Sequence, residues 1–127
     1  MCRRAVLGRD FLGWEAKKIG GGPPPLRTVE GWVVIYHGVD QNSVYRVGAA
    51  LLDLDHPLQV IARFPEPILE PERSFETIGD VPNVVFPTGT ALFDDDLFIY
   101  YGGADKAIGM ATCRLSELVH ELKRCKI

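Results

Sequence analysis

A stretch of nine residues that occurs twice in the chain decides the fold. Its first copy reads Trp32-Val33-Val34-Ile35-Tyr36-His37-Gly38-Val39-Asp40, and its second reads Leu97-Phe98-Ile99-Tyr100-Tyr101-Gly102-Gly103-Ala104-Asp105. A second match follows after a loop that is shorter in the second copy: Val47-Gly48-Ala49-Ala50 aligns with Ile108-Gly109-Met110-Ala111. Runs of β-branched and aromatic residues that end in glycine and aspartate are typical of strands followed by turns. The chain therefore contains two copies of one antiparallel unit.

Each copy belongs to a longer meander of strand-like runs. In the first unit these are Leu26–Val29, Trp32–His37, Tyr45–Leu52 and Gln59–Phe64. In the second unit they are Asn83–Phe93, Leu97–Gly102 and Ala107–Cys113. The spacing of hydrophobic residues changes from strand-like to helical only at the end of the chain. There Leu115, Leu118, Val119 and Leu122 predict a short amphipathic helix with Ser116 as its N-cap.

A repeated meander of this kind is typical of a radial β-array such as a propeller. We expect an all-β fold with one unit over 18–64, a proline-rich connection over 65–82, a second unit over 83–114 and a terminal helix over 115–125. Closed propellers need about four blades or more. Two units therefore predict that residues 1–127 are a fragment of a single larger domain.

Composition excludes several classes of protein. The net charge is −3, and the 14 basic residues are scattered, so no nucleic-acid or membrane partner is indicated. The uncharged segment before Asp94 is interrupted by prolines and cannot cross a bilayer as a helix. Cys2, Cys113 and Cys125 lack the spacing of a zinc site or a disulfide framework. With no secretory signal visible, we expect a cytoplasmic chain with reduced thiols and no metal.

Three residues break the local pattern and are candidates for binding. His37 ends a buried-looking strand, Lys18 precedes a run of glycines and prolines, and Asp105 follows paired glycines. Each has a structural explanation as well: a histidine in this place commonly forms a hydrogen bond within the fold, and the aspartate is a common turn residue. The run Asp94-Asp95-Asp96 lacks calcium-loop spacing and reads as a solvated turn.

Together with their surroundings these residues resemble the C-terminal part of family 130 of the glycoside hydrolases, the β-mannoside phosphorylases and their relatives. The resemblance runs from about residue 10 to 120. The segments that carry it are Lys18–Pro25, Gly31–Val39, Tyr45–Leu54, Pro67–Pro71, Val81–Gly89 and Tyr100–Asp105.

The resemblance implies a five-bladed β-propeller, of which this chain is about two four-stranded blades. It also implies inverting phosphorolysis of β-mannosides or mannooligosaccharides, with inorganic phosphate as co-substrate, no cofactor, and mannose 1-phosphate as product. The general acid of the family belongs to its N-terminal blades. We therefore expect no catalytic residue in this chain and no activity of the chain alone.

The resemblance also assigns roles to five residues. Lys18 and His37 match positions that hold phosphate, and Asp105 matches a residue of the mannosyl subsite. Tyr45 and Phe86 lie at motif positions near the sugar and either stack on it or pack in the core. Two alternatives stay open: a hydrolytic relative of the same family, and a non-catalytic carbohydrate-binding module that self-associates through open sheet edges.

Overall fold

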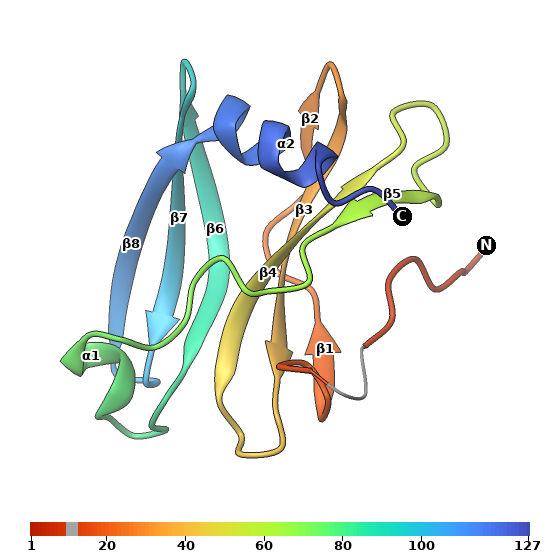
Figure 1. Ribbon diagram of the computed structural model, residues 1–127. Helices are drawn as coiled ribbons and strands as arrows, with labels where there is room; N and C mark the ends of the chain where they lie inside the picture. The colour runs from red at the N-terminus through yellow and green to blue at the C-terminus, as the bar shows by residue number, and fades with distance from the viewer. Residues whose placement is uncertain (10–12) are drawn as a thin grey trace.

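The computed structural model describes residues 1–9 and 13–127, which form two antiparallel sheets and two helices (Figure 1). The first sheet contains five strands: β1 (Lys18–Gly20), β2 (Leu26–Thr28), β3 (Gly31–Val39), β4 (Tyr45–Leu52) and β5 (Val60–Arg63). The second contains β6 (Val85–Phe93), β7 (Asp96–Gly103) and β8 (Ala107–Arg114). Helix α1 (Ser74–Thr77) lies in the connection, and α2 (Leu115–Lys123) follows β8. Neither described helix is long and apolar enough to cross a membrane.

The predicted strands are confirmed, but the expectation of two four-stranded sheets is wrong. In the first sheet, β1 and β2 both pair with β3, β1 through His37–Val39 and β2 through Gly31–Val33. The prolines between them lack an N–H and cannot continue the ladder, so this edge is split into two short strands. In the second sheet, no fourth strand pairs with β8 among the described residues.

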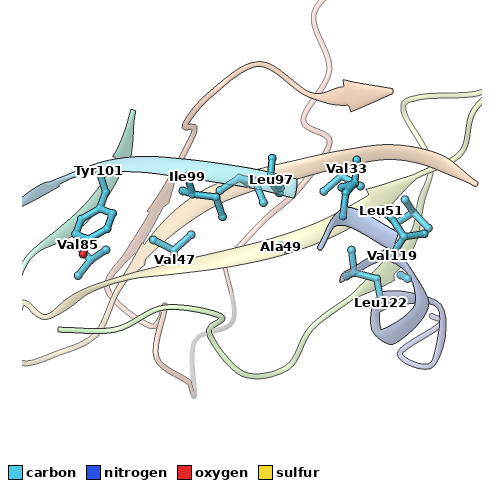
Figure 2. Close-up of a cluster of buried hydrophobic side chains, with 13 residues drawn as sticks. Val33, Val47, Ala49, Leu51, Val85, Leu97, Ile99, Tyr101, Val119 and Leu122 are labelled. Carbon is cyan, nitrogen blue, oxygen red and sulfur yellow. The ribbon is translucent and has the colours of Figure 1, made fainter. Parts of the chain in front are cut away.

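The core lies between the two sheets (Figure 2). Side chains alternate along a strand, so one face of β3 and β4 points towards the second sheet. The middle of that face is buried, as are the facing side of β7 and the start of β6. Its main members are Val33, Ile35, Val47, Ala49 and Leu51 from the first sheet and Val85, Leu97, Ile99 and Tyr101 from the second. The two sheets therefore form one hydrophobic unit.

Helix α2 closes one end of this core, where Val119 and Leu122 lie beside Leu51 (Figure 2). The predicted N-cap, Ser116, is wrong, because the helix already begins at Leu115. Its first amides are satisfied by Asp95 from the β6–β7 turn: the Leu115 N–H donates to the Asp95 carbonyl at 2.8 Å, and the Ser116 N–H donates to the Asp95 carboxylate at 2.9 Å. The aspartate turn is thus a tertiary cap as well as a solvated loop.

Each sheet is fastened by a buried glutamate that accepts a hydrogen bond from a tyrosine. In the first sheet the Tyr36 hydroxyl donates to Glu15 at 3.2 Å, and burial raises the pKa of Tyr36 to about 12, so the hydroxyl keeps its proton. In the second, Tyr101 donates to Glu76, the residue that also accepts the N–H groups of Glu72 and Arg73 before α1.

The tyrosine contacts extend the repeat beyond the matched sequences. An aromatic residue precedes each glutamate and stacks on the tyrosine: Trp14 on Tyr36 with centroids 5.9 Å apart, and Phe75 on Tyr101 at 6.3 Å. The connection therefore contains the start of the second unit, which sequence periodicity did not reveal. Helix α1 was not predicted either, because four residues held by one buried carboxylate leave no periodic signal.

Glycine at position 109 is required by the tyrosine opposite it. A Cβ on Gly109 would lie 2.5 Å from the Tyr101 ring, whereas a Cβ on Gly102 would meet nothing within 4 Å. We expect Gly109→Ala to lower the free energy of unfolding by about 1–3 kcal/mol, because Tyr101 is held by Glu76 and cannot move without cost. Gly102→Ala is the matched control, with a change within about 0.5 kcal/mol. Urea denaturation measures both, and equal effects would contradict this packing argument.

Candidate functional site

The candidate site lies at the seam between the two sheets. His37 is near the end of β3 and Tyr45 begins β4, whereas Phe86 is near the start of β6. The His37 and Phe86 rings are 4.4 Å apart between centroids, His37 and Tyr45 are 5.9 Å apart, and Tyr45 and Phe86 are 6.2 Å apart. These three rings form one aromatic cluster built from both sheets.

The His37 imidazole is held in one tautomer. Its Nδ1 lies 2.9 Å from the Gly21 carbonyl oxygen, and because a carbonyl only accepts, Nδ1 carries the hydrogen. Nε2 is then the ring nitrogen that remains for a ligand. Gly20 lies against the same ring: a Cβ there would be 2.4 Å from Cε1. Gly20 and Gly21, at the start of the run of glycines and prolines that follows Lys18, therefore support the His37 ring.

Burial and charge both favour the neutral imidazole. His37 is 8% exposed, and this burial lowers its pKa below the ordinary value. The hydrogen bond to Gly21 opposes that effect, and the nearby charge of Lys18 lowers the pKa further. His37 is therefore a group whose proton affinity an incoming anion would raise.

Lys18 reaches the same cluster from β1. Its ammonium lies over the Tyr45 ring, 5.1 Å from the centroid, which is within cation–π range. The neighbouring Lys17 differs, because its ammonium is bound to the Ser43 hydroxyl at 2.8 Å. Of the two adjacent lysines, Lys18 is the one that brings positive charge to the rings.

Asp105 lies in the β7–β8 turn. Ala104 and Asp105 both have positive φ, 48° and 54°, and the Lys106 N–H donates to the Gly103 carbonyl at 3.0 Å, as in a type I′ turn. Asp105 is therefore a turn residue, as its structural explanation predicted. Within the described part of the chain, the Asp105 carboxylate makes no hydrogen bond to the protein.

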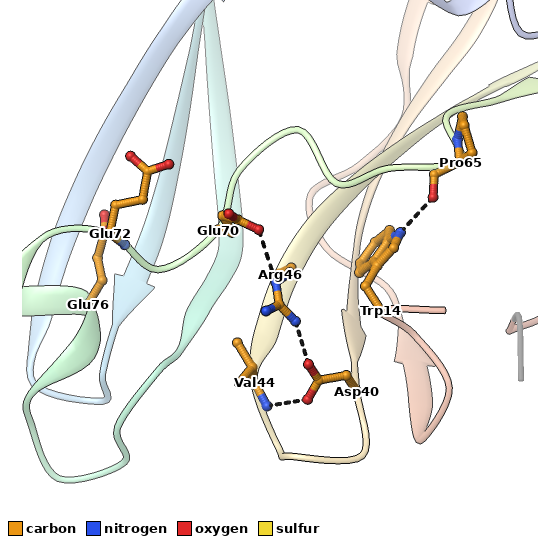
Figure 3. A network of polar contacts seen from close by, with 8 residues as sticks. All are labelled: Trp14, Asp40, Val44, Arg46, Pro65, Glu70, Glu72 and Glu76. Atoms are coloured by element: carbon orange, nitrogen blue, oxygen red, sulfur yellow. Dashed lines mark hydrogen bonds and ion pairs between the residues drawn. The ribbon is translucent and has the colours of Figure 1, made fainter. Parts of the chain in front are cut away.

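In contrast, the carboxylate of Asp40, the equivalent residue of the first unit, is bound within the protein (Figure 3). It accepts the N–H groups of Asn42 and Val44 and pairs with Arg46 at 2.6 Å. Burial opposes its ionisation, but these hydrogen bonds outweigh it and hold the pKa of Asp40 below its ordinary value. Arg46 also contacts Glu70 at 3.2 Å and so ties the connection to the first sheet.

Asp105, Tyr45 and Phe86 line one pocket of about 310 Å³. The remaining lining residues are Val81, Val84, Thr88 and Gly102. Together with the ring contacts and Lys18, this places all five predicted site residues in one region. Tyr45 is half-buried and Phe86 is 37% exposed, so neither is a core residue.

A larger pocket of about 380 Å³ lies under α2, away from these residues. Charged groups in its lining already have partners within the protein, since Lys123 forms an ion pair with Glu30 at 2.9 Å and Asp95 caps helix α2. The pocket at the seam has an unengaged carboxylate and aromatic walls, and is the better candidate. Among the residues that the structure describes, no group of three His, Cys, Asp or Glu side chains could hold a metal ion.

Comparison with known proteins identifies the family. The family profile described as β-1,4-mannooligosaccharide phosphorylase matches residues 3–124, a longer span than the resemblance indicated. A 1,2-β-oligomannan phosphorylase of Thermoanaerobacter sp. is 52% identical over 83% of this chain and 36% of its own length. A β-1,4-mannooligosaccharide phosphorylase of Ruminococcus albus is 43% identical over 94% of this chain and 37% of its own. The chain belongs to glycoside hydrolase family 130 and spans about a third of the length of these curated relatives.

Solved structures give the same result. A β-1,2-mannobiose phosphorylase of Listeria innocua, in complex with β-1,2-mannobiose, matches 94% of this chain with a TM-score of 0.90 and 39% identity. A second structure comes from work on family members that are glycoside hydrolases acting on β-1,2 mannosidic linkages in Candida mannan, and it matches with a TM-score of 0.80 and 31% identity. In each case the match covers 34% of the solved chain.

The electrostatic coupling between Lys18 and His37 can be measured directly. We expect the His37 pKa, followed by NMR, to lie below 6.5 and to rise in Lys18→Met, because a repelling charge is removed. Lys17→Met is the control and should leave it unchanged. Since the folded pKa is depressed, His37 contributes stability that is present above its unfolded pKa and is lost as the pH falls through the folded value. A His37 pKa that is the same in the wild type and Lys18→Met would contradict this coupling.

Proposed function

We propose that the chain forms about two blades of a five-bladed β-propeller and contributes part of the active site of a β-mannoside phosphorylase. Its two units share one strand pattern, and their sheets pack face to face as blades do. Family membership and the match to about a third of each relative support the same proposal. The single observation that carries it is the gathering of Lys18, His37 and Asp105 around one aromatic cluster.

The five residues would divide into two subsites. Lys18 and His37 would hold inorganic phosphate, through an ammonium charge and Nε2 respectively. A hydrogen bond from Nε2 to phosphate requires the imidazolium, because the neutral ring has its proton on Nδ1. Phosphate binding would therefore be accompanied by proton uptake. Such charge-assisted contacts are about twice as strong as neutral hydrogen bonds.

The mannosyl unit would occupy the pocket beside them. The Asp105 carboxylate would accept hydrogen bonds from sugar hydroxyls, and Tyr45 and Phe86 offer ring faces to the apolar side of the sugar. A phosphate oxygen would attack the anomeric carbon as the bond to the leaving sugar breaks, and a carboxylic acid would protonate the departing oxygen. That acid would come from the part of the family's fold that this chain does not span.

A hydrolytic member of the family is the nearest alternative. An inverting hydrolase needs a second carboxylate to activate water, whereas phosphate is already a nucleophile and needs cations to hold it. The lysine and histidine at this site favour phosphate. A non-catalytic carbohydrate-binding module is favoured only by the β8 edge, which pairs with no fourth strand among the described residues.

Activity should require the rest of the fold. We expect no mannose 1-phosphate from the isolated chain with β-1,2-mannobiose and phosphate, and formation of this product when the N-terminal two-thirds of the Listeria innocua β-1,2-mannobiose phosphorylase is co-expressed with it. In that complex, Lys18→Met and His37→Ala should each lower kcat/KM for phosphate at least about tenfold, which corresponds to about 1.4 kcal/mol. Lys17→Met is the matched control and should retain activity.

Two results would contradict the proposal. One is phosphate-dependent cleavage by the isolated 127 residues, since no general acid is expected in them. The other is cleavage by the complex that is equally fast without phosphate and yields two molecules of mannose with no mannose 1-phosphate, which would assign a hydrolase.

A further inference from the structure

Residues 81–84, between α1 and β6, form a seam segment that joins the two sheets beside the candidate site. The Asn83 carbonyl accepts the N–H of Tyr45, the first residue of β4, at 3.0 Å. A parallel bridge also pairs Tyr45 with Val84. These are backbone contacts between the first sheet and the chain that enters the second sheet. The seam segment therefore fixes the first residue of β4 relative to the start of β6.

The same segment is bound to the turn that carries Asp105. The Val81 N–H donates to the Ala104 carbonyl at 3.0 Å, and the Ala104 N–H donates to the Val84 carbonyl at 3.0 Å. Ala104 is fully buried, and both valines line the pocket together with Asp105. The seam segment thus connects Tyr45 of the first sheet with the turn of the second sheet that holds the pocket carboxylate.

These hydrogen bonds require a turn inside the seam segment. In a regular antiparallel pair one residue exchanges both hydrogen bonds with a single partner, whereas Ala104 bonds to Val81 and to Val84. Pro82 and Asn83 therefore form a tight turn between the two valines. Proline fixes φ at about −65°. Asn83 has a φ of 60°, and a proline followed by a residue of positive φ is typical of a type II turn.

The backbone of Asn83, and not its side chain, makes the contacts of the seam. Its side chain is exposed, whereas its carbonyl holds Tyr45. Asparagine adopts the left-handed conformation more readily than most residues that have a side chain, and β-branched residues adopt it least readily. The type of residue at position 83 therefore determines whether the turn, and with it the bond to Tyr45, can form.

We propose that Asn83 is a positioning residue, whose left-handed backbone sets the spacing between the phosphate-binding residues of the first sheet and Asp105 of the second. The inference rests on the proposed function, in which the first sheet holds phosphate and Asp105 holds the mannosyl unit. The attacking oxygen must lie about 3–3.5 Å from the reacting carbon, and a displacement of about 1 Å can cost about 100-fold in rate. Each subsite also has its own support, since Gly21 holds His37 and the Asp105 turn is closed by its own hydrogen bond.

The kinetic test uses the complex of this chain with the N-terminal two-thirds of the Listeria innocua relative. We expect Asn83→Val to lower kcat at least tenfold, because a β-branched residue drives the turn towards extended backbone and changes the spacing. The KM for phosphate should change less than about threefold, because Lys18 and His37 are untouched. Asn83→Gly should keep kcat within about twofold of the wild type, because glycine adopts a positive φ readily.

The β6–β7 turn supplies a matched control at the other end of the second sheet (Figure 1). Asp94 is exposed, as Asn83 is, and has a similar positive φ of 53°. Asp94→Val introduces the same backbone strain far from the site, so it should lower Tm by a comparable amount and leave kcat unchanged. An equal loss of kcat in the two valine variants would overturn the positioning role. A tenfold loss of kcat in Asn83→Gly would also overturn it and assign the effect to the amide side chain.

Hydrogen exchange of the chain alone tests the seam without any activity. In Asn83→Val the Tyr45 amide should exchange at least about tenfold faster, relative to the Val47 amide, than in the wild type. The Val47 N–H donates to the Leu69 carbonyl at 2.9 Å and is the reference within the same strand. Asn83→Gly and Asp94→Val should leave this ratio unchanged. If Asn83→Val does not fold, Asn83→Ala provides the same comparison.

Two further outcomes separate this inference from the proposed function. An unchanged ratio of Tyr45 to Val47 exchange in both Asn83→Val and Asn83→Ala would overturn the inference. Faster Tyr45 exchange in these variants, together with no phosphorolysis by the wild-type complex, supports the seam as the element that sets the spacing and contradicts the proposed function.

Discussion

The contact between one face of the first sheet and one face of the second determines the rest of the structure. Neither sheet can bury its apolar side chains alone, and their packing excludes water from Val33, Val47, Leu97 and Ile99. The same packing sets the separation of the sheet ends, where the His37 and Phe86 ring centroids are 4.4 Å apart. The candidate site is thus a consequence of the core, since its parts come from both sheets.

Two buried carboxylates complete this arrangement from outside the strands. Glu15 and Glu76 each fasten a segment that precedes its sheet to a tyrosine inside it. In the first unit Arg63 of β5 pairs with Glu15 and donates to the Tyr36 hydroxyl at 3.3 Å, so the outermost strand joins the fastening. In the second unit the N–H groups of Glu72 and Arg73 supply the additional donors. The glutamate–tyrosine hydrogen bond is therefore present in both units, but the other donors to the glutamate differ between them.

The strands and the repeat could be predicted because β-branched and aromatic runs are local signals, and β4 begins and ends where the sequence indicated. Features that depend on partners distant in sequence could not be predicted. Ser116 has the side chain of an N-cap, but Asp95 supplies the capping contacts. Asp40 and Asp105 occupy equivalent positions of the repeat, yet only the environment of each in the fold separates a structural carboxylate from one that faces a pocket. The Gly21 carbonyl that orients His37 has no sequence signature at all.

The most direct test of the site is to locate where ligands bind. NMR chemical-shift mapping with phosphate and with mannose measures this residue by residue. We expect phosphate to shift the signals of Lys18 and His37, and mannose to shift those of Tyr45, Phe86 and Asp105, so that one ligand-binding region spans the seam between the two sheets. Shifts confined to the pocket under α2, around Glu30 and Lys123, would contradict the assignment of the seam as the binding site.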